Sequence, residues 1–425
     1  MVDYLPRIID GELDELLPGL AAIALDGPRG VGKSETARRR AGTFFAVDES
    51  DTAQILASDF GLIDRSTTPV VLDEWQRLPE LWDRVRRSVD HDPYAGGRFL
   101  LTGSAAPPAD VPLHSGAGRI VSLRMRPLSF AERSIETPTV SLAALLGGEA
   151  SIEGQTDIGV QTYVDEILAS GFPGIRGLAP RLQRNRLDGY LANIAERELP
   201  ELGTRVRRPG TLFGWLRAYA AATASTASYN AILDAATPGE DQKPAKTTTI
   251  AYRDALAKLW LLDPVDAWSP LANPFTRLAG APKHFLADPA LAARLLDLDA
   301  DSLLGARGVA PLGPQPGPML GRLFEALAAL SIQTYAQAAE ARVGHLRTRN
   351  GDREIDFIVH RGDHRIVAVG VKLAAGVDDK DVRHLNWLHA ELGDRVTERV
   401  ILTTGQYAYR RPDGVAVVPL ALLGP

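Results

Sequence analysis

Eight consecutive residues near the start of the chain have the types and spacing needed to hold phosphate groups. The glycines allow backbone N–H groups to converge on phosphate oxygens, and a helix beginning here adds its positive end. A lysine ammonium can contact β- and γ-phosphates, and a serine hydroxyl is a small magnesium ligand. The segment matches the pattern G-x-x-x-x-G-K-[ST]. Its residues, with the acidic residue that follows, are Gly27, Pro28, Arg29, Gly30, Val31, Gly32, Lys33, Ser34 and Glu35.

The flanking residues predict the elements that such a phosphate loop requires. Residues 21–26 are a short apolar run typical of a buried parallel strand. Residues 35–40 contain good helix formers and no helix breaker. The sequence therefore predicts a strand, a phosphate-binding loop and a helix, with Lys33 and Ser34 where the helix begins.

Two further apolar segments end in polar residues that suit nucleotide hydrolysis. Residues 68–74 end in Asp73 and Glu74, of which the first could hold magnesium and the second could act as general base. Residues 98–104 end in a segment that contains Thr102 and Ser104, and either hydroxyl could orient the attacking water. Nucleotide sites in parallel sheets lie at the carboxyl ends of the strands. These residues are therefore predicted to lie beside the phosphate loop.

The spacing of these segments predicts a doubly wound α/β domain over residues 1–150. Residues 43–47 supply a further strand, and residues 81–89 have the periodicity of a crossover helix. A repeated strand–helix order indicates a parallel sheet covered by helices.

Residues 151–280 predict a helical domain of winged-helix type. Helices are expected over 190–199 (ended by Pro200), 211–223, 228–236 and 250–261, with a breaker-rich loop at 237–244 and a short strand carrying Trp268. Only seven of the 47 basic residues are lysines, and four lie between residues 243 and 283. The basic residues at or near the helix over 250–261, which suit contact with DNA phosphates, are Lys243, Lys246, Arg253 and Lys258, with Lys283 beyond them. The alternative is a solvated helix face that packs against its neighbour.

Long stretches of the chain resemble the bacterial and archaeal AAA-like ATPases that carry a C-terminal domain of unknown function related to restriction endonucleases. The matching segments are GPRGVGKS (27–34), VVLDEWQRLP (70–79), FLLTGSA (99–105), GRIVSLRMRPLSFAE (118–132), ASGFPGIR (169–176), KHFLADPALAARLL (283–296) and GRLFEALAAL (321–330). The resemblance implies ATP and Mg²⁺ as cofactors, Asp73 and Glu74 as a Walker B pair, and Thr102 or Ser104 in the sensor position. It also implies that Arg119 reads the nucleotide state, the alternative being a surface ion pair. Because AAA-type sites commonly borrow an arginine from a neighbouring subunit, a homo-oligomer is expected.

Residues 281–425 predict a third domain with a helix–three strands–helix–strand order. A breaker-rich stretch at 304–318 precedes the first helix of this order. This order resembles the restriction-endonuclease-like fold, and the resemblance matches Glu325, Asp356 and Lys372 to its metal-binding acids and its lysine. Gly370 stands where a further acid is required, so a degenerate nuclease fold is favoured over an active enzyme that uses Glu354 or Asp352. Lys372 could equally be a structural strand-end lysine.

Composition excludes several classes of protein. The chain has 425 residues with 47 basic and 53 acidic side chains, a net charge of −6, which excludes a uniformly basic nucleic-acid coat protein. It has no cysteine, which excludes disulfide scaffolds, cysteine-based zinc sites and thiol nucleophiles. No signal peptide or long apolar segment is apparent, so a cytoplasmic protein without a membrane span is expected.

These observations predict a Mg²⁺-dependent ATPase that couples ATP hydrolysis to DNA binding or remodelling. One alternative is a non-enzymatic regulator that binds a partner protein under the control of ATP. The other is an ATP-dependent nuclease.

Overall fold

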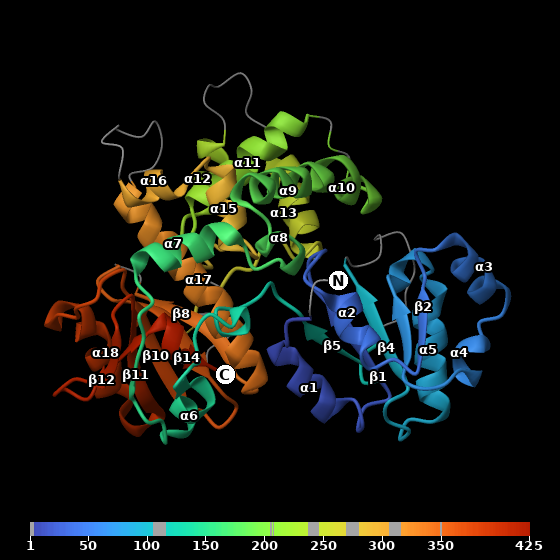
Figure 1. Ribbon diagram of the computed structural model, residues 1–425, viewed down its shortest axis with the longest axis horizontal. Coiled ribbons are helices and arrows are strands. Elements are labelled where there is room, and N and C mark those ends of the chain that lie inside the picture. Colours follow the sequence, from blue (N-terminus) through green and yellow to red (C-terminus); the bar gives the residue numbers. More distant parts are fainter. Residues whose placement is uncertain are drawn as a thin grey trace.

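The computed structural model describes residues 4–104, 116–204, 206, 208–236, 246–268, 280–305, 316–348 and 351–425. Its first unit is built on a five-stranded parallel sheet of order β2-β3-β4-β1-β5 (Figure 1). The strands are β1 (Ala22–Asp26), β2 (Thr43–Ala46), β3 (Val70–Asp73), β4 (Phe99–Gly103) and β5 (Ile120–Arg124). The accompanying helices are α1 (Ile8–Leu16), α2 (Lys33–Arg38), α3 (Ser50–Ser58), α4 (Leu62–Arg65) and α5 (Glu80–His91). The predicted parallel α/β unit is confirmed.

The central strands are apolar along their length because both faces of the sheet are covered. Side chains on one face, including Leu72 and Leu101, pack with α3, α4 and α5. Side chains on the other face, including Ile23 and Leu100, join the core that contains α1 and reaches the rest of the molecule. All five strands are parallel, so their carboxyl ends meet at one edge of the sheet, where the phosphate loop begins.

A group of helices follows. These are α7 (Val160–Ala169), α8 (Pro173–Arg176), α9 (Pro180–Asn193), a π-helical turn (Ile194–Glu198), α10 (Leu199–Glu201), α11 (Pro209–Ala221), α12 (Tyr229–Ala235), α13 (Lys246–Lys258), α15 (Pro289–Leu295) and α16 (Ala300–Leu304). The helix predicted over 190–199 is thus the end of a longer helical run that begins at Pro180. Pro200 does not end this run, because it lies in the first turn of α10, where a backbone N–H is not needed.

The extended segment after α13 pairs with two other segments of the chain. Leu262 and Val265 make antiparallel bridges to Leu286 and Lys283, and Ala267 bridges to His345 of the C-terminal sheet. The helical character of this region agrees with the prediction, whereas the winged-helix arrangement gains no support. The predicted loop at 237–244 falls on residues 237–245, which lie outside the described residues.

The C-terminal unit contains a mixed seven-stranded sheet of order β7-β12-β13-β11-β10-β9-β8. Its strands are β7 (Gly154–Gln155), β8 (Arg342–Arg347), β9 (Glu354–His360), β10 (Ile366–Val371), β11 (Val396–Thr403), β12 (Tyr407–Arg410) and β13 (Ala416–Pro419), with helices α17 (Pro316–Ala338) and α18 (Asp379–Leu392). The order α17-β8-β9-β10-α18-β11 is the predicted order of elements.

Strands on both sides of the boundary predicted at residue 150 pair with the C-terminal unit, and the boundary itself stays a prediction. β6 (Val140–Ser141) pairs with β14 (Leu423–Gly424), and β7 pairs with β12. Helix α6 (Leu142–Gly147) packs on α17, β10 and β11. Strand pairing and helix packing therefore assign residues 140–155 to the C-terminal unit. Helices α15 and α16 lie within residues 281–425, which were predicted to form the third domain. They pack against helices of the middle unit such as α7.

Helix α17 lies at the centre of the molecule (Figure 1). It packs against α1 of the first unit, α7 and α15 of the middle unit, and β8 and α6 of the C-terminal unit. One continuous cluster of buried apolar side chains extends through all three regions.

Candidate nucleotide-binding site

The loop between β1 and α2 adopts a conformation that depends on its glycines. A Cβ atom at Gly27 would lie 2.1 Å from the carbonyl oxygen of Met125, so any side chain there would displace the loop. Gly32, directly before α2, has a φ of 104°, which L-residues rarely adopt. The backbone of this loop is therefore held close to β5 and turns sharply into α2.

Lys33 is buried within the loop that precedes it. Its Nζ donates to the carbonyl oxygens of Gly27 (2.7 Å) and Pro28 (2.9 Å), and the residue is only 4% exposed. Burial lowers the pKa of Lys33 to about 8, against the opposing effect of carboxylates that include Glu74 and Asp73. Phosphate oxygens would supply stronger acceptors for this ammonium than the two carbonyl groups do.

The predicted polar strand ends come together beside this loop. The Thr102 hydroxyl donates a short hydrogen bond to Asp73 Oδ1 and accepts one from the Glu74 N–H (3.4 Å). The Ser104 hydroxyl donates to Glu74 Oε2 at 3.1 Å. Asp73 and Thr102 are buried partners in the register of β3 and β4. Glu74 has a φ of 54°, an uncommon conformation for a non-glycine residue that is frequent at functional sites.

Gln76 is a residue of this cluster that the sequence reasoning did not single out. It lies in the short 3₁₀ turn Trp75–Arg77, and its amide nitrogen donates to Glu74 Oε2 (2.5 Å) and to the Ser104 hydroxyl (3.4 Å). Its amide oxygen is buried without a hydrogen-bond partner. The spacing of two residues from Glu74, within VVLDEWQRLP, was the available signal.

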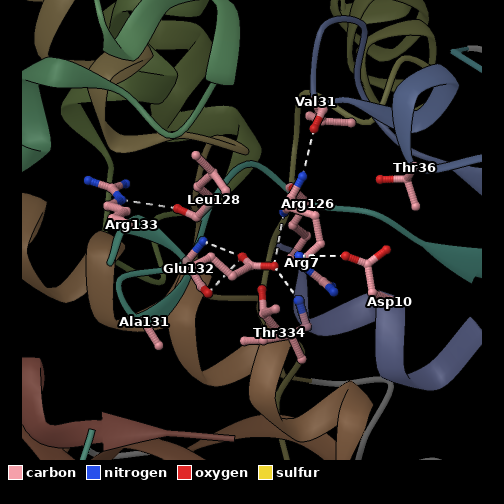
Figure 2. A network of polar contacts seen from close by, with 12 residues as sticks. Arg7, Asp10, Val31, Thr36, Arg126, Leu128, Ala131, Glu132, Arg133 and Thr334 are labelled. Carbon is pink, nitrogen blue, oxygen red and sulfur yellow. Dashed lines mark hydrogen bonds and ion pairs between the residues drawn. The ribbon is translucent and has the colours of Figure 1, made fainter. Parts of the chain in front are cut away.

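A buried polar network supports the phosphate loop from below (Figure 2). The Arg7 guanidinium donates to the carbonyl oxygens of Val31 (2.7 Å) and Arg126 (2.6 Å) and pairs with Glu132 at 3.0 Å. Glu132 also accepts from the Ile8 N–H at 2.8 Å. Arg7 was not predicted, because an isolated arginine near the N-terminus carries no pattern.

Two acids of the helical run α9–α10 reach the first unit. Glu198 lies 3.5 Å from Arg29 of the phosphate loop, and Glu201 lies 3.4 Å from Arg77. Burial raises the pKa of Glu198, while Arg29 acts to lower it. Sequence analysis placed Arg29 in the loop but did not foresee an acidic partner from the middle unit.

Arg119 is not brought to this site. It directly precedes β5, whereas the phosphate loop follows the other end of the neighbouring parallel strand β1. Its guanidinium pairs with Asp90 at 2.8 Å, and its side chain is 45% exposed. Within its own chain Arg119 thus forms the surface ion pair of the alternative, and its role in reading the nucleotide state stays a prediction.

The acids of the predicted nuclease site meet, but around a different lysine. Lys283 Nζ lies 2.7 Å from Glu325, 2.9 Å from Asp356 and 3.5 Å from Glu354. Its side chain is 1% exposed. Lys372 instead pairs with Asp381 at 3.6 Å. The ammonium of Lys283 thus occupies the space between the carboxylates.

Burial and the charge of Lys283 have opposite effects on the pKa values of the acids in this cluster. Burial and the neighbouring Asp356 raise the pKa of Glu325. Burial acts to raise the pKa of Asp356 too, but Lys283 and the Val371 N–H outweigh it and hold that pKa below its usual value. The described residues contain no group of three or more histidine or acidic side chains arranged to hold a metal ion. A Cβ atom at Gly370 would lie 2.7 Å from Ile401, so no acid fits there without rearrangement.

Several of the basic side chains that were predicted to contact DNA are buried, paired with an acid or outside the described residues. Lys283 is buried and cannot contact a ligand surface. Arg253 pairs with Asp254 at 2.8 Å and lies over the ring of Tyr229. Lys243 and the side chain of Lys246 lie outside the described residues. Among the predicted contacts that the structure describes, only Lys258 remains an exposed lysine on α13.

The parallel sheet and the loop between β1 and α2 define an AAA-like P-loop nucleotide-binding unit. Residues 21–134 match the family described as an AAA domain. Residues 160–302 and 320–423 match two families described as domains of unknown function, DUF8612 and DUF4143. A comparison with curated proteins found no match. Within the described part of the chain, no helix combines the length and apolar character required to cross a membrane.

Proposed function

We propose that this protein binds Mg²⁺–ATP at the loop of residues 27–34 and hydrolyses it. The observation that carries the proposal is the meeting of Lys33, Asp73 and Glu74 at one edge of the parallel sheet, with Thr102 and Ser104 bonded to the two carboxylates. This combination supplies a phosphate-binding cation, a metal ligand and a base within one site.

Each residue has a distinct role in this proposal. Lys33 would leave the carbonyl oxygens of Gly27 and Pro28 to contact the β- and γ-phosphates. Glu74 would accept a proton from the attacking water, and its hydrogen bond from Ser104 would fix the carboxylate toward that water. Thr102 would hold Asp73 in place.

The donor set also suits magnesium. Asp73 supplies a carboxylate and Ser34 a hydroxyl, and Mg²⁺ prefers such hard oxygen ligands together with phosphates and water. When bound, the ion would neutralise charge that develops on the phosphates. A site of this kind does not require three protein acids.

The direct test is ATP hydrolysis by the full chain with two variants. Lys33→Ala is expected to weaken nucleotide binding by about a hundredfold. Glu74→Gln is expected to retain binding and to lower the rate of hydrolysis by roughly 10²–10⁴-fold. Turnover by the wild type no faster than by either variant would contradict the proposal.

The partner that hydrolysis acts on stays a prediction. Hydrolysis rates with and without single-stranded, duplex and branched DNA, at several salt concentrations, test coupling to DNA, because phosphate contacts weaken with salt. The mass of the assembly in saturating ATP analogue tests the expected homo-oligomer. A rate indifferent to every DNA would favour the alternative of an ATP-controlled regulator of a partner protein.

A further inference from the structure

An acidic side chain of the middle unit lies beside the phosphate loop of the first unit. Glu198 ends the π-helical turn between α9 and α10, whose run lies above the first unit in Figure 1. Its side chain is 10% exposed, and Oε1 lies 3.5 Å from Nη1 of Arg29. Its charge is also felt by Lys33, alongside Glu74. A carboxylate of the middle unit thus faces the cations that would bind phosphate.

Stability alone does not explain this arrangement. Arg29 is 48% exposed, and ion pairs with a well-solvated partner contribute little to folding. Burying the Glu198 carboxylate near Glu74 costs desolvation and repulsion. The pair therefore contributes little to the free energy of folding, and burying Glu198 is electrostatically unfavourable.

The local backbone is also unusual. Residues Ile194–Glu198 form a π-helical turn inserted between two α-helical segments. Such turns are rare in proteins, and those that occur often lie at functional sites. Here the turn ends at the residue that reaches the phosphate loop.

We propose that Glu198 determines nucleotide preference: it pairs with Arg29 and opposes the triphosphate more than the diphosphate. The γ-phosphate adds negative charge on the side of Lys33 and Glu74, the groups whose charges Glu198 already influences. Binding ATP therefore requires Glu198, and the α9–α10 run that carries it, to give up the contact with Arg29. This is how the middle unit senses the γ-phosphate. The inference rests on the proposed function of the site.

The test compares the affinities of the full chain for a non-hydrolysable ATP analogue and for ADP, by calorimetry. Glu198→Gln removes the charge and keeps the shape, and is expected to tighten binding of the ATP analogue about tenfold, with a change of about threefold or less for ADP. The matched control is Glu196→Gln, an exposed glutamate on the same turn, which should change neither affinity. Glu198→Asp keeps the charge and should keep the wild-type preference.

The outcomes separate this inference from the proposed function. Equal shifts for both nucleotides, or weaker binding of the ATP analogue, would overturn the role of Glu198. If Glu198→Gln is unfolded by circular dichroism, Glu198→Ala removes the same charge and must give the same change in preference. In another outcome the wild type binds both nucleotides and Lys33→Ala loses binding, while the Glu198 variants keep the wild-type preference. That result would support the proposed function and reject only this inference. A wild type that binds neither nucleotide would reject both.

Discussion

Two of the described lysines are almost completely buried, and their neighbours give them opposite properties. Lys33 faces backbone carbonyl groups, so burial lowers its pKa to about 8. Lys283 faces carboxylates, and the attraction of Asp356 and Glu325 outweighs burial and raises its pKa above the usual value. A lysine with a lowered pKa and weak acceptors is ready for an anionic ligand, whereas one enclosed by acids is a structural counter-ion.

Nucleotide affinity should fall at alkaline pH because of Lys33. Phosphate binding favours the charged ammonium, so the complex holds a proton that the free protein loses above a pH of about 8. Affinity should be level below that pH and fall by up to about tenfold per pH unit above it. Titration of an ATP analogue from pH 6.5 to 9.5 measures this. An affinity for the ATP analogue that does not change between pH 6.5 and 9.5 would contradict this prediction.

Removing the charge of Lys283 should destabilise the C-terminal unit. Lys283→Met keeps the length of the side chain but leaves the partly buried Asp356 carboxylate without its counter-ion, at a cost of up to about 3–5 kcal/mol. Without the ammonium the folded-state pKa of the acids rises, so the defect should shrink as pH falls from 8 to 5.5. Urea unfolding at both pH values is the measurement. Lys380→Met, at an exposed lysine paired with Asp378, is the control and should change little.

At the scale of elements, the phosphate loop depends on a segment far away in the sequence. Arg7 joins the loop at Val31 to the turn after β5 at Arg126, and Glu132 closes the network (Figure 2). Segment 118–132, noted for its family resemblance, therefore has a physical role as the support of the loop. This role requires a buried cation at residue 7, which no periodicity would reveal.

Arg7→Met should weaken both folding and nucleotide binding. It leaves Glu132 as an uncompensated buried charge, and breaking a buried pair costs about 3–5 kcal/mol. Because Val31 loses its hydrogen bond from Arg7, the loop should also bind an ATP analogue less tightly. Thermal unfolding and calorimetry measure the two effects. Arg39→Met, at an arginine whose side chain is 50% exposed, should show neither.

At the scale of the whole molecule, one buried acid joins the three regions. Asp263, just after α13, pairs with Arg124 (2.9 Å) and Arg126 (2.8 Å) at the end of β5. Arg126 also donates to Gln333 (3.2 Å) and Gln337 (3.3 Å) of α17. Movement of the first unit would therefore be transmitted to the other two through side chains that are largely buried.

Asp263→Asn should lower the stability of the whole chain by about 3 kcal/mol at neutral pH. Burial acts to raise the pKa of Asp263, but Arg124 and Arg126 outweigh it and hold that pKa below its ordinary value. Stability from the charged form is thus complete above the unfolded pKa of about 3.9 and is lost as pH falls through the folded pKa. Urea unfolding should show the gap between wild type and variant closing only below a pH of about 4. A gap already closed at pH 6 would contradict this, and Asp297→Asn, at an acid whose side chain is 71% exposed, is the control.

The local chemistry of the first unit could be predicted from the order of its residues. The phosphate loop, the strands β1, β3 and β4 and the polar ends Asp73, Glu74, Thr102 and Ser104 could be predicted, because strand–loop–helix patterns are set by neighbouring residues. Helices α17 and α18 and strands β8, β9, β10 and β11 of the C-terminal unit could be predicted for the same reason.

The contacts between charged residues that are distant in the chain depend on the tertiary structure. It placed Lys283 between Glu325 and Asp356, kept Arg119 away from the phosphate loop, and brought Glu198 to Arg29. These pairings depend on how helices and sheets that are distant from one another in the chain pack together. A single charged side chain has no periodicity, so its partner is determined by the packing of the apolar core that surrounds it.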